Sequence, residues 1–140
     1  MFNRSNFKKL AAFLETVDDD QFNMNVFFRD YDIVENDYLV EGKTTCGTVA
    51  CAAGWGPAAG ILAADNCQYW GDYICDMFLD GEGLSSGLDL NPVYRWVFSE
   101  AWSVADNSPK GAAARIRWML AGKPIDLPIH NETVEKYMKG

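Results

Sequence analysis

The fold class of this chain is decided by the stretch from Asn91 to Gly122, which reads NPVYRWVFSEAWSVADNSPKGAAARIRWMLAG. It contains two dipeptides, Asn91-Pro92 and Ser108-Pro109, in which a helix-capping side chain precedes a proline suited to the first helical turn. Gly122, with Pro124 just beyond it, forms a stop signal for the second helix. The stretch therefore predicts two helices with sharply defined starts.

Apolar periodicity predicts further helices on both sides of this stretch. Residues 5–17 carry an apolar stripe at helical spacing. Residues 47–64 are predicted to form a helix rich in small residues, with a kink or restart at Gly56-Pro57. A third helix is predicted over residues 65–78, and Asn131 is a candidate cap for a short final one.

These elements indicate a mainly α fold. The 140 residues contain no internal repeat, low-complexity tract or linker, so we expect a single globular domain over residues 1–140. The predicted architecture is a compact bundle of about five to six helices. A small β-hairpin around residues 31–41 is an optional addition, because short apolar runs flank a polar turn there.

The negative charge is concentrated in one segment. The net charge is −8, and residues 15–41 hold nine acidic residues against one basic residue, while the remainder of the chain holds eleven of each. Phosphate contacts need clustered Lys and Arg, so direct nucleic-acid binding is not expected. A basic partner protein fits this charge, and the alternative is a solvated face that keeps the chain soluble. The partner-binding candidates are Asp18, Asp19, Asp20, Asp30, Asp32, Glu35 and Asp37.

A second distinctive run, from Thr44 to Trp55, reads TTCGTVACAAGW. Hydroxyls and free amides at a helix start would hold a small anion such as a nucleotide, with an arginine as countercharge. The ligand-binding candidates are Thr45, Cys46, Gly47, Thr48 and Arg115. The run matches neither the phosphate loop nor the dinucleotide fingerprint. The alternative is that it packs tightly in the core.

The four cysteines leave three interpretations open. A metal site is one, although the spacings C-x4-C and C-x7-C lack the short knuckles of zinc sites. A nucleophilic Cys46 is another, with His130 as the one histidine available as a base. The third is inert buried thiols. We assign no catalytic residue, no metal ligand and no cofactor, and expect a protein that is not an enzyme.

The run from Trp102 to Ile116 is WSVADNSPKGAAARI, and its turn-forming and capping residues predict a turn followed by a capped helix. Arg115 within it either binds an acidic ligand or pairs with Asp106 or a helix-end carbonyl. We favour the structural role.

The sequence predicts no contact with a membrane. No apolar run approaches the ~20 residues that cross a bilayer, and the start lacks the pattern of a signal peptide. We therefore expect a cytosolic protein with reduced cysteines. The oligomeric state stays open.

Three motifs resemble those of small uncharacterised proteins from tailed bacteriophages and prophages. The first is Phe22-Asn23-Met24, the second is C-G-T-x-x-C-x-x-G-[W/H] at Cys46 to Trp55, and the third is W-x3-D-N-[T/S]-P-x-G-A-A-x-R-I at Trp102 to Ile116. The resemblance spans most of the chain but brings no established activity with it. Trp55 stands where some members of the family have histidine, which weakens a metal site further.

The resemblance implies a phage accessory protein acting in the host bacterial cytoplasm. Our first expectation is a non-enzymatic binder of a host or phage macromolecule, serving host takeover or anti-defence through the acidic segment. The alternative is a protein that binds or sequesters a small anionic ligand of the nucleotide type. A minor virion component is the third.

Overall fold

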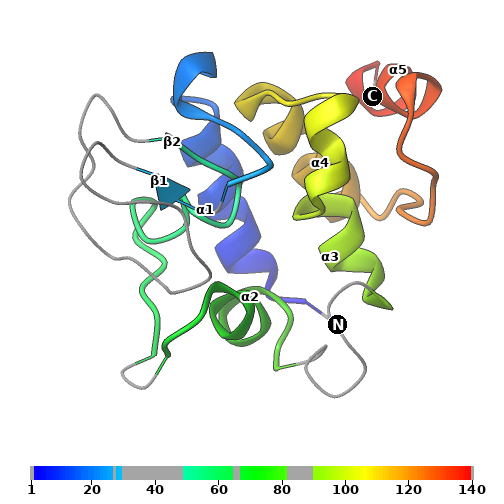
Figure 1. Cartoon of the computed structure of the whole chain (residues 1–140). Helices are drawn as coiled ribbons and strands as arrows, with labels where there is room; N and C mark the ends of the chain where they lie inside the picture. Colours follow the sequence, from blue (N-terminus) through cyan, green and yellow to red (C-terminus); the bar gives the residue numbers. More distant parts are fainter. Residues whose placement is uncertain (1, 27, 30–48, 65–66, 82–89, 140) are drawn as a thin grey trace.

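The computed structural model describes residues 2–26, 28–29, 49–64, 67–81 and 90–139. Its helices and strands follow in chain order in Figure 1. The α-helices of the described residues are α1 (Arg4–Leu14), α2 (Trp70–Phe78), α3 (Pro92–Val97), α4 (Pro109–Leu120) and α5 (Asn131–Met138). Two 3-10 helices, η1 (Asp19–Gln21) and η3 (Glu100–Val104), and two short strands, β1 (Phe28–Arg29) and β2 (Val49–Ala50), complete the set. The predicted mainly α fold is confirmed.

The two helices predicted from their capping dipeptides are present with the predicted starts. The Asn91 side chain accepts hydrogen bonds from two backbone N–H groups of α3, and Pro92 occupies the first turn. The Ser108 hydroxyl accepts from the N–H of Gly111 at 3.0 Å, with Pro109 in the first turn of α4. After α4, Gly122 adopts a φ of +79°, the left-handed conformation in which helices commonly end.

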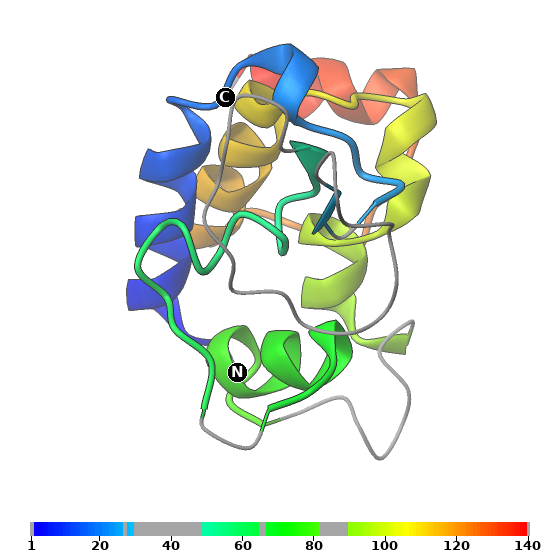
Figure 2. The same ribbon diagram turned by 60° about the vertical axis from the view of Figure 1, so that its left-hand side comes forward.

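The first and fourth helices form the central pair of the fold. α1 packs along α4 and crosses one end of α2 (Figure 2). Phe7, Leu10 and Leu14 are fully buried on the inner side of α1, as the predicted apolar stripe requires. At the far end of the pair, Arg117 of α4 donates to Glu15 at 2.5 Å. The predicted helix over 5–17 is thus correct in kind, although it begins at Arg4 and ends at Leu14.

The helix predicted over residues 47–64 is wrong within the described residues of that range. β2 covers Val49–Ala50, and tight turns follow as far as Gly60. Gly60 has a φ of +89°, which helical residues do not adopt. Gly56 lies so close to Tyr73 that an added Cβ would stand 2.2 Å from the tyrosine hydroxyl. The small residues therefore allow a compact chain reversal against α2, and no helix forms.

The two described strands pair with each other and lie on either side of the range of the predicted hairpin. β1 pairs with β2 antiparallel, with the Cα of Phe28 opposite Ala50 and that of Arg29 opposite Val49. The predicted hairpin at 31–41 lies outside the described residues. So does Asp65, the predicted cap of the third helix, and the described helix α2 begins at Trp70 with Tyr69 before it.

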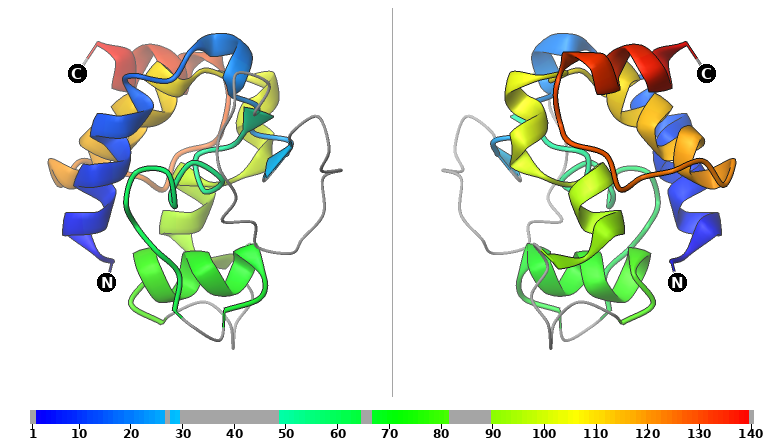
Figure 3. Two further views of the ribbon diagram at one scale, coloured as in Figure 1. Left: turned by 90° about the vertical axis from the view of Figure 1, so that its left-hand side faces the viewer. Right: turned by 90° about the vertical axis from the view of Figure 1, so that its right-hand side faces the viewer.

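The buried apolar side chains form one cluster between these elements. It includes Phe7, Trp70, Trp96, Trp102 and Tyr137. Figure 3 shows α5 and the segment before it covering the face of α4 that lies away from α1. The tryptophans are buried there, apart from the half-buried Trp118.

Candidate functional site

The described part of the predicted acidic surface is a turn that follows α1. We call residues 15–20 the acidic turn. Asp18, Asp19 and Asp20 are exposed, and Asp19 and Asp20 belong to the short helix η1. Lys110 at the start of α4 borders an open depression that the acidic turn otherwise lines. The remaining partner-binding candidates, Asp30, Asp32, Glu35 and Asp37, lie outside the described residues.

Three of the four carboxylates of the acidic turn form no ion pair within the described part of the chain. Glu15 bonds to Arg117, whereas no ion pair joins Asp18, Asp19 or Asp20 to a residue that the structure describes. Three consecutive exposed carboxylates produce a local negative potential, which the single charge of Lys110 at the edge of the depression offsets only in part. The arrangement can attract a positively charged surface.

The ligand-binding candidates are not brought together by the described residues. Thr45, Cys46, Gly47 and Thr48 lie outside them. Arg115 is described and has no exposed surface. Its Nη1 donates to the carboxylate of Asp106 at 3.3 Å, so the predicted pairing with Asp106 is confirmed. A ligand would have to reach a guanidinium that is enclosed on all sides.

Arg115, Asp106 and Tyr137 form a buried polar cluster. Nη1 of Arg115 also donates to the hydroxyl of Tyr137 at 3.1 Å and to the backbone carbonyl of Asp106 at 3.3 Å. The Tyr137 hydroxyl in turn donates to the Asp106 carboxylate. The Ser108 hydroxyl donates to the other carboxylate oxygen at 2.7 Å. The cluster thus joins the turn before α4, the middle of α4 and the last helix α5.

Aromatic rings enclose the guanidinium of Arg115. Its central carbon lies 4.2 Å from the ring centroid of Trp102 and 5.7 Å from that of Tyr137. Trp96, Trp102 and Tyr137 meet edge to face, with centroids 5.5–5.7 Å apart. Nε and Nη2 of Arg115 have no hydrogen-bond partner among the described residues. The π faces of these rings therefore stabilise the positive charge of the buried guanidinium where it makes no hydrogen bond.

Burial changes the protonation behaviour of the cluster. Loss of water lowers the pKa of Arg115 from its ordinary value, an effect opposed by Tyr137 and Asp106. Burial raises the pKa of Tyr137, and Asp106 adds to the rise while Arg115 opposes it. The tyrosine therefore stays protonated and keeps its hydrogen bond to Asp106 across the physiological range. Tyr137 lies on the predicted final helix, and no local signal in the sequence indicated its role beside Arg115.

The first and third motifs of the resemblance are in direct contact. Oδ1 of Asn107 accepts a hydrogen bond from the backbone N–H of Met24 at 2.7 Å. Nδ2 of Asn107 donates to Oδ1 of Asn23 at 3.3 Å. Asn107 therefore fixes the loop after η1 against the start of α4.

The described end of the second motif packs on the same loop. Trp55 donates from Nε1 to the carbonyl of Gln21 at 3.0 Å. The N–H of Cys51 donates to the carbonyl of Val26 at 2.9 Å. The three motifs therefore meet at residues 21–26, and their described contacts hold the fold together.

The described cysteines are distributed through the core and its edge. Cys51 and Cys75 are buried, whereas Cys67 is half-buried. Burial raises the pKa of Cys75 to about 11, with Asp76 and Asp72 adding smaller effects in the same direction. Such a thiol is a poor nucleophile at neutral pH. Within the described residues, no group of three metal-ligating side chains lies close enough to hold an ion.

Among the helices of the described residues, none is long and apolar enough to cross a membrane. Comparisons with models of known protein families, with curated proteins and with solved structures find no match for this chain.

Proposed function

We propose that the chain is a non-enzymatic binding protein that attaches to a basic surface of a partner macromolecule through its acidic segment. The observation that carries the proposal is the run of three exposed carboxylates, Asp18 to Asp20, which form no ion pair with any described residue. Together with Asp30, Asp32, Glu35 and Asp37 they belong to the part of the sequence that holds the whole net charge of −8.

The surroundings of the acidic turn favour binding over a purely solvating role. Glu15 accepts hydrogen bonds from Arg117, so one end of the turn is anchored to the packed α1–α4 pair. Asp18 is the residue before η1, and the helical backbone of η1 sets the positions of Asp19 and Asp20. A charged group on a fixed scaffold loses less conformational entropy on binding than one on a free chain.

The partner fits a host or phage protein rather than nucleic acid. A phosphate backbone would be repelled by this surface, whereas a Lys- or Arg-rich protein surface would be attracted. The phage resemblance supports a role in host takeover or anti-defence within the bacterial cytoplasm. That context is an analogy, and the charge of the surface is the physical argument.

The test is affinity capture from a bacterial lysate with matched variants. The tagged full chain is compared with the triple variant Asp18→Asn, Asp19→Asn, Asp20→Asn. The control variant, Glu100→Gln, Glu132→Gln, Glu135→Gln, removes three exposed carboxylates from other parts of the surface. Both variants change the net charge equally, so a difference between them reports position and not overall charge.

The proposal expects a basic protein that is captured by the native chain and the control but lost with the acidic-turn variant. Raising the salt from about 0.1 M to 1 M shortens the Debye length from about 10 Å to about 3 Å and should release it. Equal capture by both variants would contradict the proposal. A melting temperature raised by a nucleotide panel would support the small-ligand alternative instead, and presence in purified particles would support a virion component.

A further inference from the structure

The guanidinium of Arg115 uses only one of its three nitrogens for hydrogen bonds to described residues. Nη1 donates to the Tyr137 hydroxyl and to both the carboxylate and the backbone carbonyl of Asp106. Nε and Nη2 are buried and donate to no residue that the structure describes. A buried donor without an acceptor loses the hydration that it has in the unfolded chain, and this loss costs free energy. We therefore expect an acceptor beside Nε and Nη2 that the described chain does not supply.

Nε and Nη2 together form one edge of the planar guanidinium. This edge lies opposite Nη1, so it faces away from Asp106 and Tyr137. Arg117, on the same helix, shows what such an edge binds, because its Nε and Nη2 donate to the two carboxylate oxygens of Glu15 at 3.3 and 2.5 Å. Two parallel N–H groups match two oxygens of one carboxylate or phosphate group. The free edge of Arg115 therefore has the geometry of an oxyanion site.

The negative charge of Asp106 is compensated by several groups besides Arg115. Its carboxylate accepts hydrogen bonds from the hydroxyls of Ser108 and Tyr137. It also lies against Gly111 in the first turn of α4, where the partial positive charge of a helix start stabilises an anion. Its one side-chain bond to Arg115 is long, at 3.3 Å. The positive charge of Arg115 is therefore available to a second acceptor on the opposite edge.

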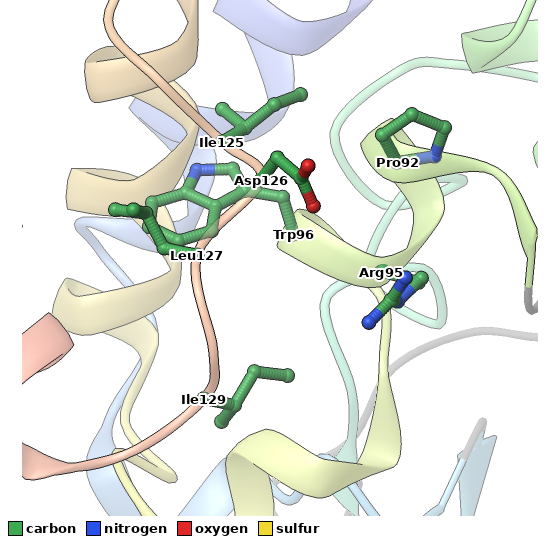
Figure 4. Close-up of a pocket in the computed structure, with 7 residues that line it drawn as sticks. All are labelled: Pro92, Arg95, Trp96, Ile125, Asp126, Leu127 and Ile129. Carbon is green, nitrogen blue, oxygen red and sulfur yellow. The ribbon is translucent and has the colours of Figure 1, made fainter.

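The enclosure of Arg115 limits the size of its ligand. Arg115 has no exposed surface, and its guanidinium lies over the ring of Trp102. The small pocket shown in Figure 4 shares Trp96 with these surroundings, but Arg115 does not line it. A ligand that extends to the surface, such as a nucleotide, does not fit this enclosure. A small ion fits it better, and it would be taken up when the chain folds around Arg115.

We propose that the Nε–Nη2 edge of Arg115 binds one small oxyanion of the carboxylate or phosphate class, which is enclosed as the chain folds. The ion accepts a hydrogen bond from each nitrogen in the plane of the guanidinium, while Trp102 covers one face. A water molecule would also accept from these donors, but it would leave the stability of the fold independent of anions. The acidic turn takes no part, so this inference does not depend on the proposed function.

The test is urea unfolding of the full chain, refolded from urea into chloride, with sodium phosphate or sodium acetate then replacing chloride at equal ionic strength. The native chain is compared with Arg115→Lys, which keeps the charge but loses the paired N–H groups. The matched control is Arg117→Lys, the same change on the same helix at a half-exposed ion pair. Since Arg115→Lys alters a buried residue, NMR of the arginine Nε–H groups in the native chain supplies a second measurement.

We expect phosphate or acetate to lower the unfolding equilibrium constant of the native chain and of Arg117→Lys, by about tenfold for each tenfold rise in concentration above the dissociation constant. Arg115→Lys should show only the weak general stabilisation that phosphate gives to folded proteins. The Nε–H signal of Arg115 should shift with the same anion. The inference is overturned if neither anion acts differently from chloride, if Arg115→Lys responds as strongly as the native chain, or if the Arg115 signal does not shift.

Discussion

The carboxylate of Asp106 fills the space above Gly111 in α4. A Cβ added at Gly111 would stand 1.9 Å from Oδ2 of Asp106, far inside van der Waals contact. The same carboxylate oxygen accepts hydrogen bonds from Arg115 and Tyr137. Glycine at this position is therefore required by the buried cluster, although glycine is a poor helix former.

Gly111→Ala should destabilise the protein although alanine raises helix propensity by about 1 kcal/mol. The methyl group would displace Asp106 from its partners, and overpacking of this kind costs about 1–3 kcal/mol. Urea unfolding measures the difference. Combining Gly111→Ala with Asp106→Ala should remove the clash, so the two substitutions together should cost less than the sum of each alone. A stabilised Gly111→Ala variant would show that the contact is absent.

Asp106→Ala should be among the most damaging single substitutions in the chain. It leaves the guanidinium of Arg115 buried without its counter-charge, which costs about 3–5 kcal/mol. Tyr137→Phe removes one hydroxyl from the same cluster and should cost about 1–3 kcal/mol. Thermal unfolding of both variants checks this order. Replacing both residues, as Asp106→Leu with Arg115→Met, should recover part of the stability lost in Asp106→Ala. If the double variant recovers none of it, the loss does not come from an uncompensated buried charge.

Asn107→Ala should loosen the contact between the first and third motifs. The backbone N–H of Met24, in a buried residue, would lose its acceptor, with a cost of about 1–3 kcal/mol. Hydrogen exchange at the Met24 amide should accelerate in Asn107→Ala. In Asn107→Asp the exchange should stay close to native, because an oxygen acceptor is retained. Equal acceleration in both variants would mean that the amide oxygen is not the acceptor.

Cys75 should resist alkylation in the folded protein. Its side chain has no exposed surface, and burial raises its pKa from 9.0 to about 11. Because the folded pKa lies above the unfolded one, the associated stability is complete below pH 9.0 and declines as the pH rises toward about 11. Iodoacetamide labelling at pH 8, read by mass spectrometry, should modify the half-buried Cys67 before Cys75. Rapid labelling of Cys75 under native conditions would contradict its burial.

Local signals in the sequence predicted some features of this fold well. The starts of α3 and α4 follow from Asn91-Pro92 and Ser108-Pro109, because a cap and its proline act within one turn of chain. The range 47–64 was predicted wrongly because its small apolar residues are equally compatible with a tightly packed helix. Pairing of β2 with the distant β1, and the contact of Gly56 with Tyr73, decided its conformation instead.

The candidate sites show the same division between local and distant effects. Arg115 and Asp106 are nine residues apart on a turn and its helix, so their pairing was a reasonable alternative from sequence. Tyr137 joins them from another helix, and only the packing of α5 on α4 reveals it. The exposure of Asp18 to Asp20 follows from composition, but the neighbouring Lys110 comes from a distant part of the chain.

Native mass spectrometry of the full chain, purified gently from infected bacterial cells, tests the central claim most directly. The account predicts a complex with one basic protein that dissociates at high salt and is missing from the variant Asp18→Asn, Asp19→Asn, Asp20→Asn. A chain that carries a nucleotide-sized mass, or a partner that the triple variant retains, would contradict binding through the acidic turn.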